Sequence, residues 1–424
     1  MDCAALKSDI DGLEQELRAL GEKVKMVREM EGCSKKLREV VKSIDSSSVD
    51  PVLEKYLKVF QERNPELLSG FTLGERMEFM DTEGNPRQVN SIAIAEDGRV
   101  LVGGDGGVLY LGFYGDEGIV LDERMEMGAV SIHSIAIDKD GSVLIGGDSG
   151  VLFEGFLNGQ NELVLGEQIY VANAGGWTNG VYSVAFIDDG RRYALIGGYD
   201  GAFHVGFYDE QGELTLFEPE DIRSAYDKPA SIFSIKTTRD GYVLLGGDDG
   251  AFYACSWDDW RHLTLGGRID IKNANGDPAD IRTIAAIDDE HMLIGGLFGT
   301  FYEGSYKGHG GFALGERLDV RDANGELGSI FSIVAIGGGH VLIGGSNGTF
   351  YDGFYDDKGK FKLGERIDIR DADGTPVDIY SIATIGDGRV LIGGKNGVFC
   401  TGSYDVSLEA LKRHLPEIIE KGEA

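Results

Sequence analysis

A glycine doublet recurs seven times along this chain of 424 residues and marks the copies of one repeating unit. Successive doublets lie 43, 51, 49, 49, 49 and 49 residues apart. They occupy Gly103-Gly104, Gly146-Gly147, Gly197-Gly198, Gly246-Gly247, Gly295-Gly296, Gly344-Gly345 and Gly393-Gly394. A period this long and this regular indicates an array of equivalent supersecondary units, and it constrains the fold more strongly than any local motif does.

Four segments of strand-like composition are visible in each copy. In the sixth copy they cover 330–336, 341–343 and 349–355, and the fourth covers 363–369. Glycine, asparagine and aspartate separate them, as tight turns require. The second segment is entirely apolar, whereas the fourth alternates polar and apolar residues. The segments therefore run from a strand buried on both faces to a strand with one face exposed to solvent. Four antiparallel strands in this order, repeated radially, describe a β-propeller blade.

The positions of the segments also predict how the array closes. Segments similar to Leu-Gly-Glu-Arg begin at Leu73, Leu121, Leu165, Leu216, Leu265, Leu314 and Leu363. The first of them precedes every inner set of strands, and the last inner set, which ends near Tyr404, has none after it. We therefore expect an all-β, seven-bladed propeller of four-stranded antiparallel blades. Residues 73–80 would supply the fourth strand of the last blade and remove two open sheet edges.

The repeat resembles known propeller families. The stretch VLLGGDDGAFYACSWDD at 243–259 and its counterparts resemble the quinoprotein-type repeat, and the apolar-Gly-Gly ending is similar to that of kelch repeats. The resemblance covers residues 73–404 and implies a propeller fold but no particular activity. The adjacent cysteine pair and the repeat-closing tryptophan of quinoproteins are missing from this sequence. Neither a quinone nor any other cofactor is therefore expected.

Charge and cysteine usage narrow the range of partners. The formal net charge is −32, and a negative field of this size repels the phosphates of nucleic acids. Four scattered cysteines without paired spacing fit a reducing compartment. The sequence shows neither a signal-peptide pattern at its start nor an apolar run long enough to cross a bilayer. We expect a cytoplasmic protein that binds neither nucleic acid nor membrane.

The two ends of the chain differ in pattern from the repeats. Apolar residues alternate in steps of four and three at Leu6, Ile10, Leu13, Leu17, Leu20, Val24 and Val27. This heptad pattern predicts an α-helical coiled-coil or hairpin module over 1–66, ahead of a propeller over 70–405. The apolar face of 406–424 predicts a short C-terminal helix. Two interpretations stay open, because residues 1–45 could pair with a partner helix or a second copy, or the module could dock on its own propeller.

A column of residues that varies between the copies is the candidate binding site. In a propeller, the loops from strand four to strand one and from strand two to strand three open on one face, around the channel mouth. Just before the nearly constant serine or threonine of strand one stand Asn90, His133, Tyr182, Phe233, Arg282, Phe331 and Tyr380. Trp177, Leu297 and Phe298 lie in loops of the same face. Aromatic and arginine side chains at a concave rim are typical of binding hot spots. The alternative is that the rings pack between blades as core.

Metal binding and catalysis have weaker signals. Asp371 and Asp373, like Asp322 and Asn324, are followed by glycine in loops that resemble the opening of a calcium site, but none has the full ligand series. The same residues suit a tight turn, so we assign no metal site. The histidines occupy unrelated blade positions and no nucleophile motif occurs, so no residue is assigned as catalytic.

The sequence thus favours a non-enzymatic scaffold that presents the channel-mouth face to a protein or peptide partner. The helical module would serve for docking or oligomerisation. One alternative is a carbohydrate-binding, lectin-like propeller, and another is a hydrolase or lyase with a carboxylate site at the channel mouth. A lectin should repeat one pocket in every blade, whereas this column changes from blade to blade.

Overall fold

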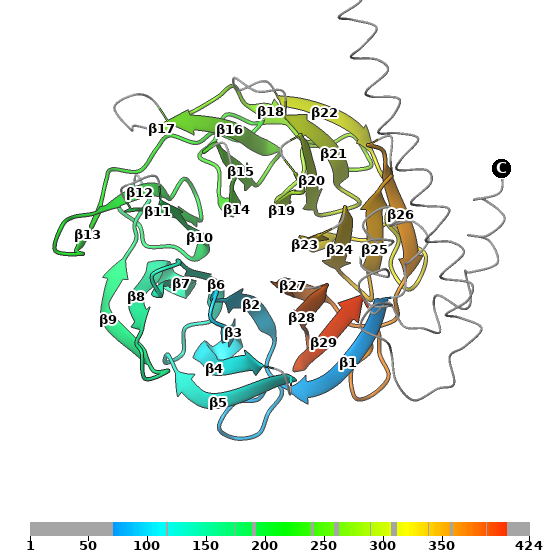
Figure 1. Cartoon of the computed structure of the whole chain (residues 1–424). Coiled ribbons are helices and arrows are strands. Elements are labelled where there is room, and N and C mark those ends of the chain that lie inside the picture. Colours follow the sequence, from blue (N-terminus) through cyan, green and yellow to red (C-terminus); the bar gives the residue numbers. More distant parts are fainter. Residues whose placement is uncertain are drawn as a thin grey trace, which may run out of the picture. The chain divides into compact units, whose positions relative to one another are not determined.

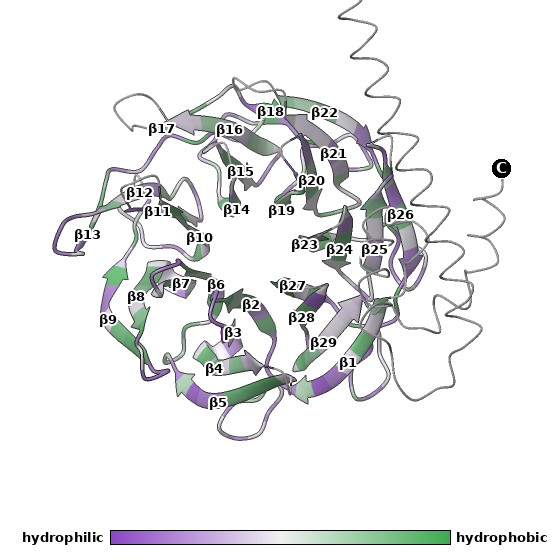
Figure 2. Cartoon of the chain, viewed as in Figure 1, coloured by the Kyte–Doolittle hydropathy of each residue, from purple (hydrophilic) through white to green (hydrophobic). Residues whose placement is uncertain are grey.

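The structure, a computed structural model, describes residues 71–404 apart from 116–117, 174, 189–191, 239–240, 258–262, 289, 307–311, 338, 357–358 and 387. These residues form seven antiparallel sheets arranged radially around a central axis (Figure 1). The predicted seven-bladed propeller is therefore confirmed. Hydrophobic residues concentrate on the inner strands, while the outermost strands carry both hydrophobic and hydrophilic residues (Figure 2). This gradient is the one that the sequence pattern predicts.

Each blade runs from an innermost first strand to an outermost fourth strand. Blades 1 to 3 consist of β2 (Val89–Ile94), β3 (Arg99–Gly104), β4 (Val108–Gly115) and β5 (Gly118–Glu126), then β6 (Ile132–Ile137), β7 (Ser142–Gly147), β8 (Val151–Leu157) and β9 (Leu163–Tyr170), then β10 (Val181–Asp188), β11 (Arg192–Gly198), β12 (Phe203–Tyr208) and β13 (Leu214–Leu216). Short 3-10 turns, η2 (Asp105–Gly107) and η3 (Asp148–Gly150), join the second and third strands of blades 1 and 2.

The remaining blades repeat this plan. Blades 4 to 7 consist of β14 (Ile232–Thr237), β15 (Val243–Gly247), β16 (Ala251–Trp257), β17 (Leu263–Thr264) and β18 (Ile269–Asp270), then β19 (Ile281–Ala286), β20 (His291–Gly296), β21 (Phe301–Tyr306) and β22 (Phe312–Arg317), then β23 (Ile330–Gly337), β24 (His340–Gly345), β25 (Phe350–Tyr355) and β26 (Phe361–Arg366), then β27 (Ile379–Gly386), β28 (Arg389–Gly394), β29 (Val398–Tyr404) and β1 (Phe71–Glu78).

The clasp that the sequence predicts is present in blade 7. Strand β1 pairs antiparallel with β29, and Met77 lies opposite Phe399. The first and last described strands therefore complete one sheet (Figure 1). Because both would otherwise be open edges, this pairing joins the two ends of the repeat array.

The helical part of the predicted fold class needs correction. The described residues contain strands and 3-10 turns but no α-helix, so the structure gives no support for an α-helical N-terminal coiled-coil module or a C-terminal helix. Both expectations fall on residues 1–66 and 406–424, which lie outside the described residues. The heptad pattern is a local sequence signal, and three heptads are near the lower limit at which it is informative. Within the described part of the chain, no helix is long and apolar enough to cross a membrane.

Two outer strands are shorter than the repeat predicts. In blade 3, strand β13 ends at Leu216, where the Leu-Gly-Glu-Arg pattern is replaced by a segment containing Pro219, which has no amide hydrogen to donate to a sheet. In blade 4, two short strands, β17 and β18, pair separately with β16. Between them lie Gly266 and Gly267, and glycine in a strand weakens the pairing.

The glycine doublets lie where neighbouring blades approach each other most closely. A Cβ atom on Gly344 would come within 2.7 Å of Cγ2 of Ile379, at the start of the next blade. The second glycine of that doublet, Gly345, lies against the backbone carbonyl of Ser329, which also leaves no room for a side chain. Seven buried apolar clusters fill the spaces between successive blades. The doublet that defines the repeat is therefore a packing requirement, both between neighbouring blades and between the second strand of a blade and the residue before its first strand.

A ring of hydroxyl groups joins the first strands of the seven blades. The serine or threonine of each first strand accepts a hydrogen bond from a backbone amide of the next first strand, at 3.0 to 3.2 Å. The donor and acceptor pairs are Ile135 and Ser91, Val184 and Ser134, Ile235 and Ser183, Ile284 and Ser234, Ile333 and Thr283, Ile382 and Ser332, and Ile92 and Ser381. This ring explains the nearly constant hydroxyl residue of the repeat.

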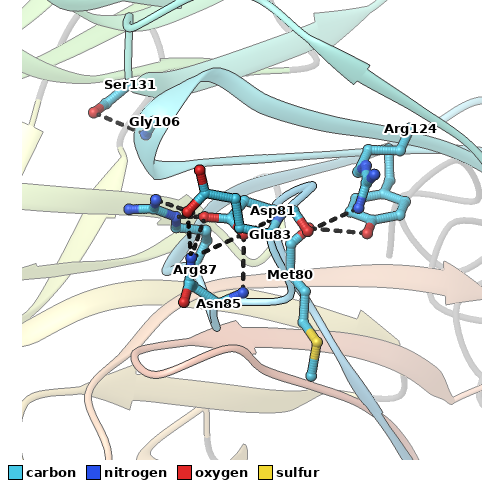
Figure 3. Close-up of polar contacts among 9 residues, drawn as sticks. Met80, Asp81, Glu83, Asn85, Arg87, Gly106, Arg124 and Ser131 are labelled. Carbon is cyan, nitrogen blue, oxygen red and sulfur yellow. Dashed lines mark hydrogen bonds and ion pairs between the residues drawn. The ribbon is translucent and has the colours of Figure 1, made fainter.

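Most connections from strand four to strand one form a compact turn. In the connection from β1 to β2, the carboxylate of Asp81 accepts hydrogen bonds from the amides of Glu83 and Asn85 and from the Arg87 side chain (Figure 3). The hydrogen bond from the Asn85 amide has the largest effect on the pKa of Asp81, and the Arg87 side chain adds to it. Together they hold this pKa well below its usual range. Six such turns are closed by a β-bridge. The connection between blades 1 and 2, the place of the 43-residue spacing, has no bridge among its described residues.

Candidate functional site

The predicted binding residues lie on the face that carries both the strand four to strand one connections and the strand two to strand three turns, which we call the mouth face. Within blade 1, the amide of Asp105 donates to the carbonyl of Gln88 at 3.1 Å. Between blades 5 and 6, the amide of Phe298 donates to the hydroxyl of Ser329 at 3.2 Å. The two sets of loops are thus hydrogen bonded to each other and form one surface.

A β-bulge occurs in every first strand at the predicted column. In blade 1, Val89 pairs with Gly104 and Ser91 pairs with Gly103, which leaves Asn90 as the extra residue. The same register shift is present in the other six blades. A bulge turns one side chain out of the regular alternation of a strand. The seven variable residues therefore hold equivalent positions because the backbone of each blade presents them in the same way.

One arc of the column is a continuous row of side chains. The ring centroids of His133 and Tyr182 are 4.7 Å apart, and those of Tyr182 and Phe233 are 5.4 Å apart. The guanidinium carbon of Arg282 lies 3.9 Å from the centroid of the Phe233 ring. Blades 2 to 5 thus contribute one residue each to a row of stacked and edge-on rings that ends in a cation–π contact.

A second arc joins blades 6 and 7, and Asn90 of blade 1 lies between the two arcs. Phe331 and Tyr380 stack with their ring centroids 5.1 Å apart. Asn90 donates hydrogen bonds of 2.9 Å to Asp105 and to the carbonyl of Ile132, at the start of blade 2. The structure therefore brings the seven predicted column residues to one face, six of them in two arcs and Asn90 in blade 1 between these arcs.

All seven column residues are half-buried. Their edges pack against neighbouring blades, as the core interpretation requires, while part of each side chain stays open to solvent. Partner binding by these residues stays a prediction, since packing alone accounts for the buried part. Because these side chains are only partly buried, a partner can cover their exposed atoms without any rearrangement of the column.

Carboxylates lie beside the column in several blades. Asp148 accepts a hydrogen bond from the Nε2 atom of His133 at 2.7 Å, and Asp280 pairs with Arg282 at 3.0 Å. Burial alone would raise the pKa of Asp148, but the contact with His133 holds that pKa below its usual value. Burial, together with the carboxylate of Asp148, raises the pKa of Tyr182. The mouth face is thus aromatic, and carboxylates pair with its basic column residues.

Leu297 and Phe298 form the strand two to strand three turn of blade 5. The Phe298 side chain is 66% exposed, and its backbone has a φ of 54°. The equivalent turn positions of the other blades also have positive φ and hold Gly106, Ser149, Asp200, Asp249, Asn347 and Asn396. Small or polar residues tolerate this left-handed conformation, whereas a bulky aromatic residue does so at a cost in free energy. Phe298 is therefore a large apolar side chain displayed on the mouth face against the local backbone preference.

Trp177 lies apart from the column. Its side chain is 73% exposed in the connection between blades 2 and 3, and no ring contact among the described residues joins it to the column. Next to this connection is a shallow, open cavity of about 380 Å³, whose lining includes Tyr170 and Phe217. The buried His204 forms part of its wall, with one ring nitrogen 2.7 Å from the carbonyl oxygen of Ala172. Of the predicted site residues, Trp177 alone belongs to this outer part of the face.

The sequence analysis missed Tyr199 and Asp200. Tyr199 is 49% exposed, and its ring centroid lies 6.4 Å from that of Tyr182. Both residues directly follow the third glycine doublet, where three other copies have Asp-Gly, Asp-Ser or Asp-Asp and the remaining three have Leu-Phe, Ser-Asn or Lys-Asn. This departure from the repeat was the available signal, and it is the same signal that identified Leu297 and Phe298.

The loop carboxylates considered for calcium accept hydrogen bonds from their own turns. One oxygen of Asp371 accepts from the amides of Asp373 and Thr375 at 3.0 and 2.9 Å. Asp322 accepts in the same way from the amide of Asn324 at 2.8 Å. These are turn contacts, in which an aspartate side chain replaces a backbone acceptor. No group of three or more metal-ligating residues occurs in the described part of the chain.

Comparison with known proteins identifies the fold and no family. Neither the protein-family profiles nor the curated proteins give a match to this sequence. Among solved structures, the chain is similar to the crystal structure of the WD40 β-propeller domain of Doa1, with a TM-score of 0.51 and 16% sequence identity. The similarity covers 80% of this chain and 99% of that domain. At this identity the likeness establishes the propeller architecture alone.

Proposed function

We propose that this protein is a non-enzymatic interaction scaffold that presents the mouth face of its propeller to a protein or peptide partner. The observation that carries the proposal is the column of seven side chains held by seven identical β-bulges. The backbone of the column is constant while its side chains differ from blade to blade. This combination is what a single asymmetric partner requires, and it differs from the repeated equal pockets of a lectin.

The composition of the column supports the same function. Four of its seven residues are phenylalanine or tyrosine and a fifth is Arg282. Aromatic residues and arginine are enriched at the centres of protein interfaces. Phe298 adds an apolar side chain that is 66% exposed and lies in a left-handed backbone conformation. A strained residue that is also exposed contributes nothing to the core, so a binding role is the simplest reason for its presence.

The test uses the full chain as bait in affinity capture from the cells that produce it. We expect the triple variant Tyr182→Ala, Phe233→Ala, Tyr380→Ala to lose its specific partner while it retains a cooperative thermal transition. The control replaces Phe113 and Phe156, two exposed phenylalanines in the half of the third strand away from the mouth face, by alanine. Equal capture by the wild type and the triple variant would refute the proposal. Loss of folding in the triple variant would instead identify the column as core.

The compartment we propose is the cytoplasm. Cys255 and Cys400 are free thiols in the described part of the chain, and both are buried. Burial raises the pKa of each thiol to about 12, so both are protected as uncharged side chains. Such cysteines suit a compartment in which thiols stay reduced. Self-association through residues 1–45 stays a prediction, which sedimentation of the full chain beside a chain without residues 1–65 would test.

A further inference from the structure

A group of aromatic and acidic side chains gathers on the mouth face around blade 3. We call it the blade 3 cluster and define it as Tyr182, Tyr199, Phe233, Asp148 and Asp200. The Tyr182 ring lies at the centre, with ring centroids 5.4 Å from Phe233 and 6.4 Å from Tyr199. The side chain of Asp148 is 45% exposed, and both Tyr199 and Asp200 are exposed. Rings and carboxylates are thus offered to solvent side by side.

The chain itself shows how this surface holds a cation. The guanidinium of Arg282 lies over the Phe233 ring and pairs with Asp280, so one face of an aromatic ring and one carboxylate bind it together. An aromatic face attracts a cation through its negative quadrupole, and a carboxylate adds a charge-assisted hydrogen bond. The Tyr199 ring, which is 49% exposed, is followed in the chain by Asp200. The half-buried Tyr182 ring contacts His133, which in turn pairs with Asp148. Among the described residues, no lysine or arginine pairs with either of these two carboxylates.

The surrounding charges favour the same ligand. Asp248 and Asp249, in the corresponding turn of blade 4, also lack a lysine or arginine partner among the described residues. Burial, with repulsion from the carboxylates of Asp249 and Asp280, raises the pKa of Asp248. A cation that approached this sector would relieve that repulsion, whereas an acidic segment would increase it. The charge of the surface therefore selects among the partners that the proposed function allows.

We propose that the blade 3 cluster binds a lysine or arginine side chain, so that the segment of the partner that reaches the mouth face is basic. This inference rests on the proposed function and specifies the chemistry of its partner. The cation would lie against the rings of Tyr182 and Tyr199, between the carboxylates of Asp148 and Asp200. Asp148 already contacts His133, whereas no lysine or arginine pairs with Asp200 among the described residues, so a neutral apolar segment would bury the Asp200 carboxylate without a cation. Burying an unpaired charge is unfavourable.

The test titrates the full chain into a fluorescein-labelled peptide of alternating arginine and glycine and follows the polarisation. A matched peptide carries citrulline, which has the shape of arginine without its charge. We expect the arginine peptide to bind and the citrulline peptide not to bind. Tyr199→Ala and Asp200→Asn should each weaken the binding by about threefold to tenfold, since each removes one element of the cation site. The double variant Tyr182→Ala, Tyr199→Ala should weaken it by more than about tenfold.

The controls separate this site from attraction by the net charge. Asp140→Asn makes the same charge change as Asp200→Asn at an exposed turn that joins first and second strands, away from the mouth face. Phe113→Ala removes an exposed ring from that opposite side. Both controls should bind the arginine peptide as the wild type does. Equal weakening by the controls, or equal binding of the citrulline peptide, would overturn the inference. If the arginine peptide fails to bind while the triple column variant still loses its native partner, the scaffold function stands and only the basic partner is wrong.

Discussion

The backbone amide of Ile92, in the first strand of blade 1, donates a hydrogen bond of 3.0 Å to the hydroxyl of Ser381, in the first strand of blade 7. The two residues are 289 positions apart in the chain. The equivalent bond joins each of the other six pairs of neighbouring blades, so the bond between Ile92 and Ser381 completes a ring on the innermost strands. The pairing of β1 with β29 closes the propeller at its outer edge. The ring is therefore closed twice, by a clasp at the rim and by a hydroxyl near the axis.

Replacing Ser381 by alanine should lower the free energy of unfolding by about 1–2 kcal/mol, because the amide of Ile92 loses its acceptor. Urea denaturation measures this change. Ser332→Ala removes the same bond between blades 6 and 7 and should have a similar effect. Ser381→Thr should be close to neutral, since Thr283 makes this bond in blade 5. An unchanged stability of Ser381→Ala would mean that the inner ring does not help to close the propeller.

The variant Gly344→Ala tests the role of the glycine doublet. A methyl group at this position would come within 2.7 Å of Cγ2 of Ile379 in the next blade. Overpacking of this kind should destabilise the protein by about 1–3 kcal/mol, measured by urea denaturation. Gly159→Ala is the control, because a methyl group there meets no atom within 4 Å. Equal stability of the two variants would show that the interface between blades adjusts to an extra methyl group.

Much of this fold could be predicted from the sequence because the propeller repeats its local rules. The doublet Gly344-Gly345 and the hydroxyl of Ser332 recur in each copy for reasons of packing and hydrogen bonding that each blade shares. Blade 3 shows the limit of this reasoning, since the repeat predicts a full outer strand from Leu216 but the strand ends there, before Pro219. The heptad pattern could not be extended to a module, because it is a local signal with no repeated context to support it.

The candidate site could be predicted only in part. The column was visible because it varies beside a constant serine, but the β-bulge that aims it depends on a pairing register that the sequence does not state. The arcs formed by Tyr182 with Phe233 and by Phe331 with Tyr380 depend on distances between blades. Tyr199 lies in a turn whose sequence varies between copies, so the sequence does not state that its ring comes within 6.4 Å of Tyr182.

His340 should make stability depend on pH. Its ring packs 4.9 Å from that of Tyr404, its Nδ1 atom is buried without a hydrogen-bond partner, and burial lowers the pKa of the imidazole below the ordinary 6.5. The unfolded chain therefore binds a proton at a higher pH than the folded chain does, so stability is lost as the pH falls below about 6.5. The variant His340→Phe should lose this dependence.

Unfolding in urea at several values between pH 5 and pH 8 measures the effect. Asp352, a buried carboxylate in the neighbouring strand β25, titrates in both proteins, so the difference between the two curves isolates His340. We expect the wild type to lose stability relative to His340→Phe toward pH 5. Parallel curves over the whole range would show that the imidazole is as free to take up a proton in the folded chain as in the unfolded one.

Phe298 should show opposite effects on stability and on binding. Its φ of 54° is a conformation that asparagine adopts readily and phenylalanine does not, and asparagine holds the equivalent turn position at Asn347 and Asn396. Phe298→Asn should therefore raise the free energy of unfolding by about 1 kcal/mol, as measured in urea. The same variant should capture less of the partner, because it removes an apolar side chain that is 66% exposed on the mouth face. Phe298→Gly should likewise raise the free energy of unfolding and capture less of the partner. If both variants were less stable than the wild type, the ring of Phe298 would have a packing role, and its exposure would no longer argue for binding.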